Sequence, residues 1–523
     1  MDTTTHSARL LRKVAVGAVA AAAMLLAPAA GLGAPGPVTA PAIPGVAGLP
    51  GPIAANATPA ANIGILKTAP DTGLAGTNFT LSGSGLPANR PVTITWSSAN
   101  VTWLLDARPD TVDYLGRVTN KVAVVLATAQ TDSTGSFSIG MVAPKDWGGI
   151  HDIYAVVDGV QYAKGGFLMA RWATISPKSG PIGTMIHITY GGLGSSLYEG
   201  GAALLYDNHF VGAMTANWTR GIASTEIRAS GPVGRHVISL DNAVNFGYLN
   251  VQQSPLPWTT EFQKTFTVTK DAGRPKSQLD WPVNVAPTLD ARTTMAATGL
   301  ATTGSATAHL SSTAGTVNTK VDVTASGLTA GAPVDMEWST VVGNRVNCSG
   351  TCWTFVSVPL GNATAAADGS LQSKITIPDG LGGWHVVQLL QNGKVVAQTP
   401  YYIKRSLVGV SSLTVHEGQL FTVHLKGLGW TQLDNTIAVD YDNSYVGYGC
   451  GFNSQGDVVL NIVATGGPGT HLIDGYPLLY SQQPSYANTP YGMVPFLTYA
   501  QDEPALALGY QLPAIRLAIT VVK

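Results

Sequence analysis

The sequence has 523 residues, with 29 Lys and Arg residues against 30 Asp and Glu residues. Charged residues make up 11% of the chain, compared with roughly 25% in an ordinary globular protein. The balanced, sparse charge provides no basic field, so we expect no nucleic-acid partner. The combined share of the 60 glycines and 32 prolines is below the roughly 25–30% of Gly and Pro that is typical of disordered chains. The hydrophobic share of 45% is ample for several cores. At about 100–200 residues per domain, we expect roughly three to five domains.

Residues 1–34 are typical of an export signal. Three basic residues precede an apolar, alanine-rich run from Val14 to Leu26, and small residues suited to cleavage follow it. An uncleaved membrane anchor is the alternative interpretation, but the run breaks at Pro28 and is shorter than the roughly 20 residues that span a bilayer. We therefore expect an extracellular or cell-surface protein with no transmembrane segment in the mature chain.

The next segment, residues 35–64, is rich in Pro, Gly and Ala and predicts a semi-extended linker. Beyond it the chain repeats itself at an offset of about 235–242 residues. The matching segments are Ser84–Ser97 with Ser326–Ser339, Pro144–His151 with Pro378–His385, Gly192–Gly194 with Gly427–Gly429, and Tyr206–Gly212 with Tyr441–Gly447. The sequence is therefore a tandem duplication of one large unit.

Each unit divides again near an arginine, Arg171 in the first and Arg405 in the second. Short alternating apolar runs are separated by turn signals every 8–12 residues, a pattern typical of β-sandwiches. We expect an all-β protein of tandem immunoglobulin-like sandwiches, arranged as two duplicated two-domain units with almost no helix in the mature chain. The expected domains are residues 65–171, 172–269, 307–405 and 406–523, with a linker at 270–306 and a C-terminal wrap in the last domain.

Two hairpins can be placed from the sequence. Asn392-Gly393 separates two apolar runs and favours a two-residue type I′ turn. Asp442-Asn443 also separates two strands, since Asp and Asn tolerate positive φ. The expected strand at Leu517 to Val522 has a weaker counterpart at Thr265 to Lys270.

The start of the second domain, from Ile175-Ser-Pro177 through Gly180-Pro181-Ile-Gly183 to Gly192-Leu-Gly194, resembles the opening of the immunoglobulin-like IPT/TIG family. The other domains resemble bacterial immunoglobulin-like surface repeats without a subfamily motif. The resemblance implies a non-catalytic sandwich that spaces, adheres or flanks an enzyme domain, and it supplies no functional residue.

The chain has three cysteines, of which Cys348 and Cys352 share a short glycine-containing loop. In an oxidising compartment this spacing favours a local disulfide, with free thiols as the alternative. A metal site would need more ligands nearby, so no metal and no cofactor are expected. Cys450 is left over, and we expect it to be a buried or half-buried thiol.

The histidines form no metal-binding or catalytic motif. His151 and His385, and likewise His236 and His471, occupy matching places after glycine-containing turns. They are interpreted as half-buried groups that bond the backbone, with a ligand or pH-sensing role as the alternative. The run from Asp440 to Asn443 resembles the start of a calcium loop, but its counterpart at Leu205 lacks the first carboxylate, so a turn is favoured.

Aromatic residues are the remaining candidates for a binding site. Trp96 and Trp338 occupy equivalent mid-strand positions and are interpreted as core residues. Exposed rings that bracket turns could stack on sugars. The candidate ligand-binding residues are Tyr206, Phe210, Tyr441, Tyr445, Trp353 and Trp430.

Together these features favour a secreted or cell-surface structural or adhesive protein, a non-catalytic spacer or binding array with its sandwiches in an extended rod. Its partner is expected to be a cell-surface polymer, a glycan or another surface protein, and self-association is possible. The alternative is a carbohydrate-binding protein or accessory module of an extracellular polysaccharide-processing system. A hydrolase with a dispersed catalytic site is a third hypothesis.

Overall fold

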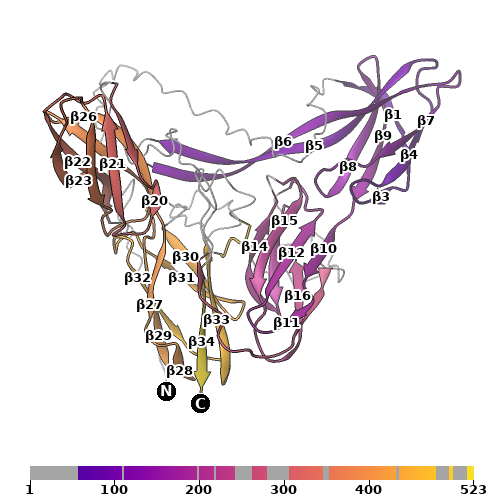
Figure 1. Ribbon diagram of the computed structural model, residues 1–523. Coiled ribbons are helices and arrows are strands. Elements are labelled where there is room, and N and C mark those ends of the chain that lie inside the picture. Colours follow the sequence, from indigo (N-terminus) through magenta and orange to yellow (C-terminus); the bar gives the residue numbers. More distant parts are fainter. Residues whose placement is uncertain are drawn as a thin grey trace, which may run out of the picture. The chain divides into compact units, whose positions relative to one another are not determined.

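The computed structural model describes residues 57–108, 111–196, 200–216, 219–241, 252, 262–279, 305–344, 353–430, 435–478, 494–498 and 515–523. These residues form 34 strands, and no α-helix is present among them (Figure 1). Within this part of the chain, no helix meets the length and apolarity needed to cross a membrane. The expected export signal at 1–34 lies outside the described residues.

The first sandwich pairs a six-stranded sheet with a three-stranded sheet (Figure 1). The larger sheet is ordered β1 (Thr58–Ile65), β9 (Val160–Met169), β8 (Gly149–Val157), β5 (Pro91–Arg108), β6 (Thr111–Gln130), with β3 (Thr72–Gly73) also on β9. The smaller sheet is ordered β2 (Lys67–Ala69), β4 (Asn78–Gly83), β7 (Phe137–Val142). Both sheets contribute to the core, in which Leu81 and Ile94 are fully buried.

The second sandwich has five strands facing three. The larger sheet is ordered β11 (Ser179–Gly180), β17 (Lys264–Val268), β16 (Gly234–Asp241), β13 (Gly201–Tyr206), β14 (His209–Thr215). The smaller sheet is ordered β10 (Trp172–Ser176), β12 (Met185–Gly191), β15 (Ile222–Arg228). Its core contains two residues from the far end of the chain, Leu472 and Ala518.

The third sandwich repeats the strand order of the first. Its larger sheet is ordered β20 (Ala314–Gly315), β26 (Lys394–Ile403), β25 (Gly383–Gln391), β22 (Pro333–Gly343), β23 (Trp353–Thr364), and its smaller sheet is β19 (Thr307–Leu310), β21 (Lys320–Ser326), β24 (Leu371–Thr376). The Asn392-Gly393 turn between β25 and β26 has φ values of 52° and 71°, as a type I′ hairpin requires.

The fourth sandwich repeats the second. Its larger sheet is ordered β18 (Gln278–Leu279), β34 (Ile515–Val522), β33 (Gly469–Pro477), β30 (Thr436–Tyr441), β31 (Ser444–Cys450), with β28 (Thr414–His416) also on β34. The smaller sheet is β27 (Ser406–Val410), β29 (Leu420–Lys426), β32 (Val458–Val463). β17 and β34 hold equivalent places, so the weak likeness between them reflects the duplication.

The structure corrects the expected bounds of two linkers. Residues Thr58 to Ile65, mostly assigned to the linker at 35–64, form strand β1 parallel to β9. The expected linker at 270–306 begins within the fourth sandwich, because Gln278 and Leu279 pair with β34. In both places the backbone gains ladder hydrogen bonds that a solvated linker would lack.

Eight sheets therefore assemble into four sandwiches of two alternating kinds. The fold is a tandem array of immunoglobulin-like β-sandwiches, in two duplicated two-domain units.

Candidate functional site

A close glycine contact joins the first sandwich to the second. A Cβ added to Gly148 would overlap the carbonyl oxygen of Gly192, so the two backbones approach as only glycines allow. The amide of Gly148 donates to the carbonyl of Leu193 at 2.8 Å. Trp147, 1% exposed, fills the joint and donates from Nε1 to the carbonyl of Ala99 at 2.8 Å.

The same joint occurs between the third and fourth sandwiches. A Cβ at Gly382 would overlap the carbonyl of Gly427, and the amide of Gly382 donates to Leu428 at 2.7 Å. In this joint the tryptophan belongs to the second member of the pair, the fourth sandwich, where Trp430 donates to the carbonyl of Trp384 at 3.2 Å. Two of the repeated glycine segments noted in the sequence are thus the two halves of a joint.

A charged contact stabilises the first joint further. Asp146 is buried, and its carboxylate accepts a hydrogen bond from Trp96 Nε1 at 3.0 Å. Arg220 of the second sandwich reaches the other oxygen at 3.3 Å and also donates to Ser98 Oγ at 2.9 Å. An ion pair between a buried carboxylate and a half-buried guanidinium, with hydrogen bonds to both, restricts the relative orientation of the two sandwiches.

The repeated histidines of the first and third sandwiches lie in the cores. His151 stacks on Trp96 with ring centroids 4.4 Å apart, and His385 stacks on Trp338 at 4.7 Å. The ring nitrogens of His385 lie 3.1 Å from the carbonyl of Ser339 and 2.9 Å from that of Leu381. Burial lowers the pKa of His385 to about 4, so it is neutral at physiological pH. The interpretation of both histidines as backbone-bonded groups, and of both tryptophans as core residues, is confirmed.

The Tyr-Asp-Asn turns of the second and fourth sandwiches capture the other pair of histidines. In the second sandwich, Asp207 Oδ2 lies 2.5 Å from His236 Nδ1, and Asp207 Oδ1 accepts from the amide of Val237 at 2.8 Å. Tyr206 stacks on the same imidazole at 5.2 Å and donates its hydroxyl to the carbonyl of Ser230 at 2.9 Å. Both side chains of the turn therefore bond to other parts of the same sandwich and stabilise it.

The fourth sandwich repeats this arrangement with His471 on Asp442 at 2.5 Å and Tyr441 bonded to the carbonyl of Thr465 at 2.8 Å. Burial alone would lower the pKa of His471, but the hydrogen bond and charge of Asp442 outweigh it, and the pKa is raised. Asp442 and Asn443 have φ values of 49° and 62°. The turn interpretation is confirmed, and the described residues contain no cluster of acidic, His or Cys side chains suited to a metal ion.

The second and fourth sandwiches share a buried interface. Arg228 and Asp474 are almost fully buried, and Arg228 Nε donates to Asp474 Oδ1 at 2.9 Å. Arg228 Nη2 also donates to the carbonyl of Leu517 at 2.6 Å. Asn443 donates to the carbonyl of Arg228 at 2.7 Å. The expectation of sandwiches arranged one after another in a rod is therefore wrong for this pair, which lies side by side.

Two further charges belong to this interface. Asp440 lies opposite Asp474 in the ladder, and Arg516 lies opposite Asp474 on the other side. Asp440 is fully buried and neither carboxylate oxygen has a hydrogen-bond partner. Burial, together with the charge of Asp474, raises the pKa of Asp440. Burial, together with the charge of Arg228, lowers the pKa of Arg516 to about 10.

A short segment of the fourth domain completes the edge of the second sandwich. Phe496 bridges in parallel to Ala213 of β14, with hydrogen bonds from the Ala213 amide to Pro495 at 2.8 Å and from the Leu497 amide to Ala213 at 2.9 Å. Thr225 of β15 donates to the carbonyl of Leu497 at 3.1 Å. The segment also bonds the end of β33, because the Phe496 amide donates to Pro477 at 2.8 Å. The described part of the C-terminal wrap thus holds two sandwiches together.

Most of the rings that were expected to be exposed are packed inside the protein, so the expectation that they are exposed is wrong. The buried ones are Tyr206, Phe210, Tyr441 and Trp430. Phe210 meets Tyr445, half-buried, across the interface of the second and fourth sandwiches, with ring centroids 6.5 Å apart. Tyr206 and Tyr441 lie in the cores of their own sandwiches, and Trp430 lies in the joint between the third and fourth sandwiches. Of the four, only Phe210 has its ring contact across the interface of the second and fourth sandwiches.

Trp353 is half-buried and packs edge-on against Trp430 at 6.0 Å. It therefore belongs to the joint between the third and fourth sandwiches. Cys348 and Cys352 lie outside the described residues. Cys450 is exposed, in contrast to the expectation of a buried thiol, because it projects from the outer side of an edge strand.

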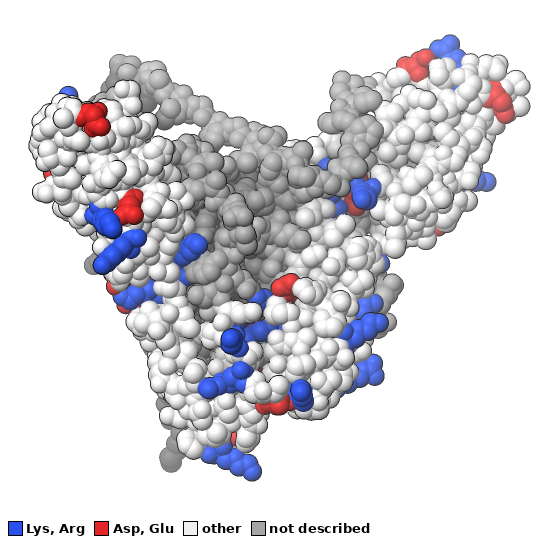
Figure 2. Space-filling model, viewed as in Figure 1, with Lys and Arg blue, Asp and Glu red and all other residues white. Residues whose placement is uncertain are grey.

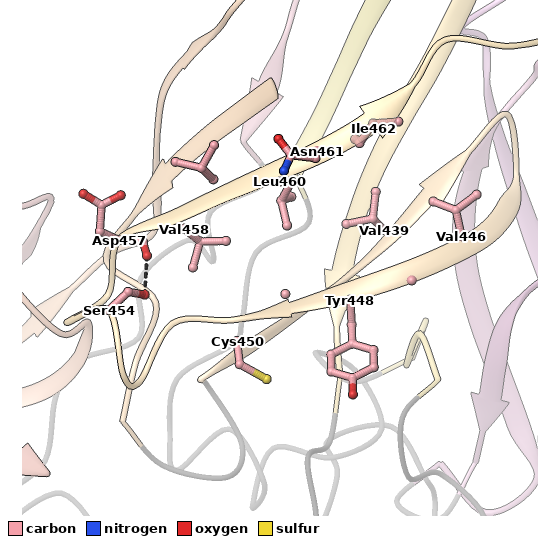
Figure 3. Close-up of a pocket in the computed structure, with 13 residues that line it drawn as sticks. Val439, Val446, Tyr448, Cys450, Ser454, Asp457, Val458, Leu460, Asn461 and Ile462 are labelled. Carbon is pink, nitrogen blue, oxygen red and sulfur yellow. Dashed lines mark hydrogen bonds between the residues drawn. The ribbon is translucent and has the colours of Figure 1, made fainter. Parts of the chain in front are cut away.

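A groove of about 840 Å³ opens between the edge strands β31 and β32 of the fourth sandwich. Figure 3 shows Val439 and Val446 projecting toward Val458 and Leu460 across the gap, while Tyr448 projects from the opposite side of β31. Val446 and Val459 are each 56% exposed. Polar groups lie at one end, where Ser454 donates to the carbonyl of Asp457. This groove, the β31/β32 groove, is an accessible apolar surface.

Sequence reasoning missed the buried charges and the β31/β32 groove. A signal for the charges exists, since Asp474 and Arg516 are the single Asp, Glu, Lys or Arg residue in β33 and β34 respectively. The groove has no such signal, because it depends on how the edge strands of two different sheets face each other.

No protein-family model matches the chain, and no curated protein matches it. Solved structures that resemble it include Salmonella alpha-2-macroglobulin, at 8% identity and a TM-score of 0.17, covering 86% of this chain and 30% of that one. The D1–D4 ectodomain fragment of ICAM-5 matches at 12% identity and a TM-score of 0.17, covering 88% of this chain and 100% of that one. A protein described as membrane anchored from Corynebacterium diphtheriae matches at 13% and 0.16, covering 65% and 90%.

This chain thus spans less than a third of the length of the alpha-2-macroglobulin. At these TM-scores the likenesses carry no argument about activity.

Proposed function

We propose that this protein is a non-catalytic, extracellular or cell-surface scaffold, in which fixed pairs of immunoglobulin-like sandwiches hold adhesive surfaces in place. The observation that carries the proposal is the glycine joint, built twice from the same sequence elements. A linker that only tethers domains needs no close backbone contact, whereas Gly148 with Gly192 and Gly382 with Gly427 interlock. The resemblance of the second domain to IPT/TIG modules is part of this proposal.

The surface supports a scaffold with little long-range electrostatic steering. Figure 2 shows Lys, Arg, Asp and Glu scattered over a face that is mostly uncharged. Such a surface associates through shape and short-range contacts, so binding to a partner would depend weakly on salt.

The joint can be tested in the full chain with Gly148→Val and Gly382→Val, singly and together. A side chain at either position forces the backbones apart, so small-angle scattering should show a broadened distribution of interatomic distances for each variant. Gly140→Ala and Gly409→Ala serve as controls, since a Cβ at either site meets nothing within 4 Å. Unchanged scattering from the double variant contradicts a fixed joint.

Location is tested on intact producing cells with an external protease and an antibody to the third sandwich. Exposure at the surface or release to the medium is the expected result. Retention of the whole protein inside the cell would overturn the proposal.

A further inference from the structure

The β31/β32 groove of the fourth sandwich is the counterpart of a groove that the chain itself fills in the second sandwich. The two sandwiches align at an offset of 235, so β31 corresponds to β14 and β32 to β15. In the second sandwich the segment Val494–Thr498 lies along β14 and reaches β15 through the Thr225 hydroxyl. Each sandwich therefore has the same pair of edge strands facing each other, and the chain's own segment fills the groove between one pair.

The glycines at the two equivalent positions show the difference directly. A Cβ built on Gly212 of β14 would lie 2.8 Å from Leu497 Cγ and 2.8 Å from the carbonyl oxygen of Pro495. The leucine thus fills the space beside Gly212, and it packs against the core of the second sandwich. A Cβ built on Gly447, the counterpart in β31, meets nothing within 4 Å. Among the residues that the structure describes, none takes in the fourth sandwich the place that Leu497 takes in the second.

The lining of the β31/β32 groove is better suited to an apolar side chain than that of its filled counterpart. Leu460 stands where the second sandwich has Thr225, and Asn461 stands where it has Glu226. Of the residues that line the groove, Asp457 carries the single charge, and its Oδ1 lies 2.6 Å from His424 Nε2. Lysine and arginine are absent from the lining, so nothing in the groove attracts an acidic ligand.

From these observations we infer that the β31/β32 groove binds an extended, uncharged peptide strand of a partner protein. A leucine-sized side chain of that strand would lie beside Gly447, as Leu497 lies beside Gly212. Docking an extended segment at the edge of a sheet is a general mode of peptide recognition, in which alternate side chains enter pockets. The inference deepens the proposed scaffold function by naming a contact surface and the chemistry of what binds there.

The test uses the full chain and a fluorescein-labelled peptide with the sequence of residues 491–500, followed by fluorescence anisotropy. Saturable binding is expected, and the same peptide with Leu497→Asp should bind at least tenfold more weakly. Because these changes are made in the peptide, the folding of the protein is not in question.

On the protein side, Val446→Lys and Val459→Lys place a charge in the groove at positions that are already 56% exposed. Each should weaken binding at least tenfold, whereas Val408→Lys, at a valine 53% exposed and outside the groove, should not. Circular dichroism melts of all three variants establish that they fold. Absence of saturable binding, or equal binding by the wild type and both groove variants, overturns the inference.

Sedimentation velocity of the chain alone tests the other candidate occupant of the groove, a second copy of this chain. If the chain dimerises and Val446→Lys prevents dimerisation, the groove holds a second copy, and the assignment to a separate partner is wrong. A negative peptide result leaves the glycine joints unaffected, and a flexible joint leaves peptide binding unaffected, so the two proposals fail independently.

Discussion

Arg228 and Asp474 are 246 residues apart in sequence, yet the guanidinium Nε of the first donates to the carboxylate of the second at 2.9 Å. Each side chain is about 98–99% removed from solvent, and they belong to different sandwiches. A charge pair at this depth forms only where two surfaces exclude water together. The second and fourth sandwiches are therefore one structural body as far as this interface extends.

Replacing Arg228 with Met should destabilise the protein strongly. The buried carboxylate of Asp474 loses its partner, and breaking such a pair from one side costs about 3–5 kcal/mol. Arg516 Nε remains 3.8 Å away and compensates in part, so we expect a value near the lower end. Urea unfolding of the full chain measures the change.

The double variant Arg228→Met with Asp474→Leu is the control, because it removes both charges. It should recover most of the lost stability. A single variant that unfolds like the wild type would show that the pair is not desolvated in solution.

Replacing Asp440 with Asn should stabilise the protein at neutral and higher pH, by about 1–3 kcal/mol. The raised pKa of Asp440 means that the folded state favours the protonated carboxyl, so stability falls as pH rises through the folded pKa. Asparagine is neutral and nearly isosteric, and it abolishes that loss. Thermal unfolding at pH 5 and pH 8 measures the effect, which should be larger at pH 8.

Asp335→Asn provides the matched control for this change. Asp335 is an exposed aspartate on β22, the strand of the third sandwich that corresponds in order to β30, so its replacement should change the melting temperature little. If Asp440→Asn lowers the melting temperature at pH 8, the carboxylate has a stabilising role that the structure does not account for.

Acid should selectively weaken the third sandwich through His385. Its pKa is about 4 when folded and about 6.5 when unfolded, so between these values the unfolded chain binds the extra proton. Stability is thus lost as pH falls from about 6.5 to about 4, by roughly 3 kcal/mol in total. His471 has the opposite sign, since its raised pKa gives a contribution present at low pH and lost as pH rises.

Hydrogen exchange at pH 4.5 and pH 6.5, read on peptides from β25 and β33, separates these two histidines. Protection in β25 should decrease at the lower pH. His385→Asn removes the titration and should flatten the pH dependence of β25, although it lowers stability at every pH. Equal pH dependence in the wild type and His385→Asn would contradict the assignment.

Trp430→Ala should cost about 3–5 kcal/mol, because the side chain is 1% exposed and its removal leaves a cavity. The loss should loosen the joint between the third and fourth sandwiches, which limited proteolysis of the full chain can detect. Exposed Val342→Ala, in the same region of the third sandwich, should have little effect. A stable, protease-resistant Trp430→Ala variant would place this ring outside the joint.

The sandwich fold was predictable because its signals are local. Alternation in the strands and the Asn392-Gly393 turn depend on neighbouring residues, and the structure agrees with both. The repeated segments can be matched directly in the sequence, and the strand orders repeat in the same way. The role of His385 was also predictable, since a buried polar group at the start of a strand bonds nearby carbonyls. Trp338, predicted as a core residue, stacks on this histidine.

The candidate site was not predictable in the same way. Tyr441 and Phe210 were expected at exposed hairpin ends, but Tyr441 packs in the core of its own sandwich and Phe210 contacts Tyr445 of the fourth sandwich. The duplication predicts that the two domains have the same fold, but it does not predict that they pack side by side. Only isolated charges, such as Asp474 in a strand with no other Asp, Glu, Lys or Arg, indicated an unusual environment.

The hydrogen bond between the amide of Thr215 and the hydroxyl of Thr498 closes a span of 283 residues. A chain that is synthesised from its N-terminus has all eight strands of the second sandwich, β10 to β17, long before Thr498 emerges. Until then β14 lacks its parallel neighbour, and the space beside Gly212 stays empty. The second sandwich thus acquires its final edge last, and a truncation upstream of Val494 removes the segment that pairs with β14.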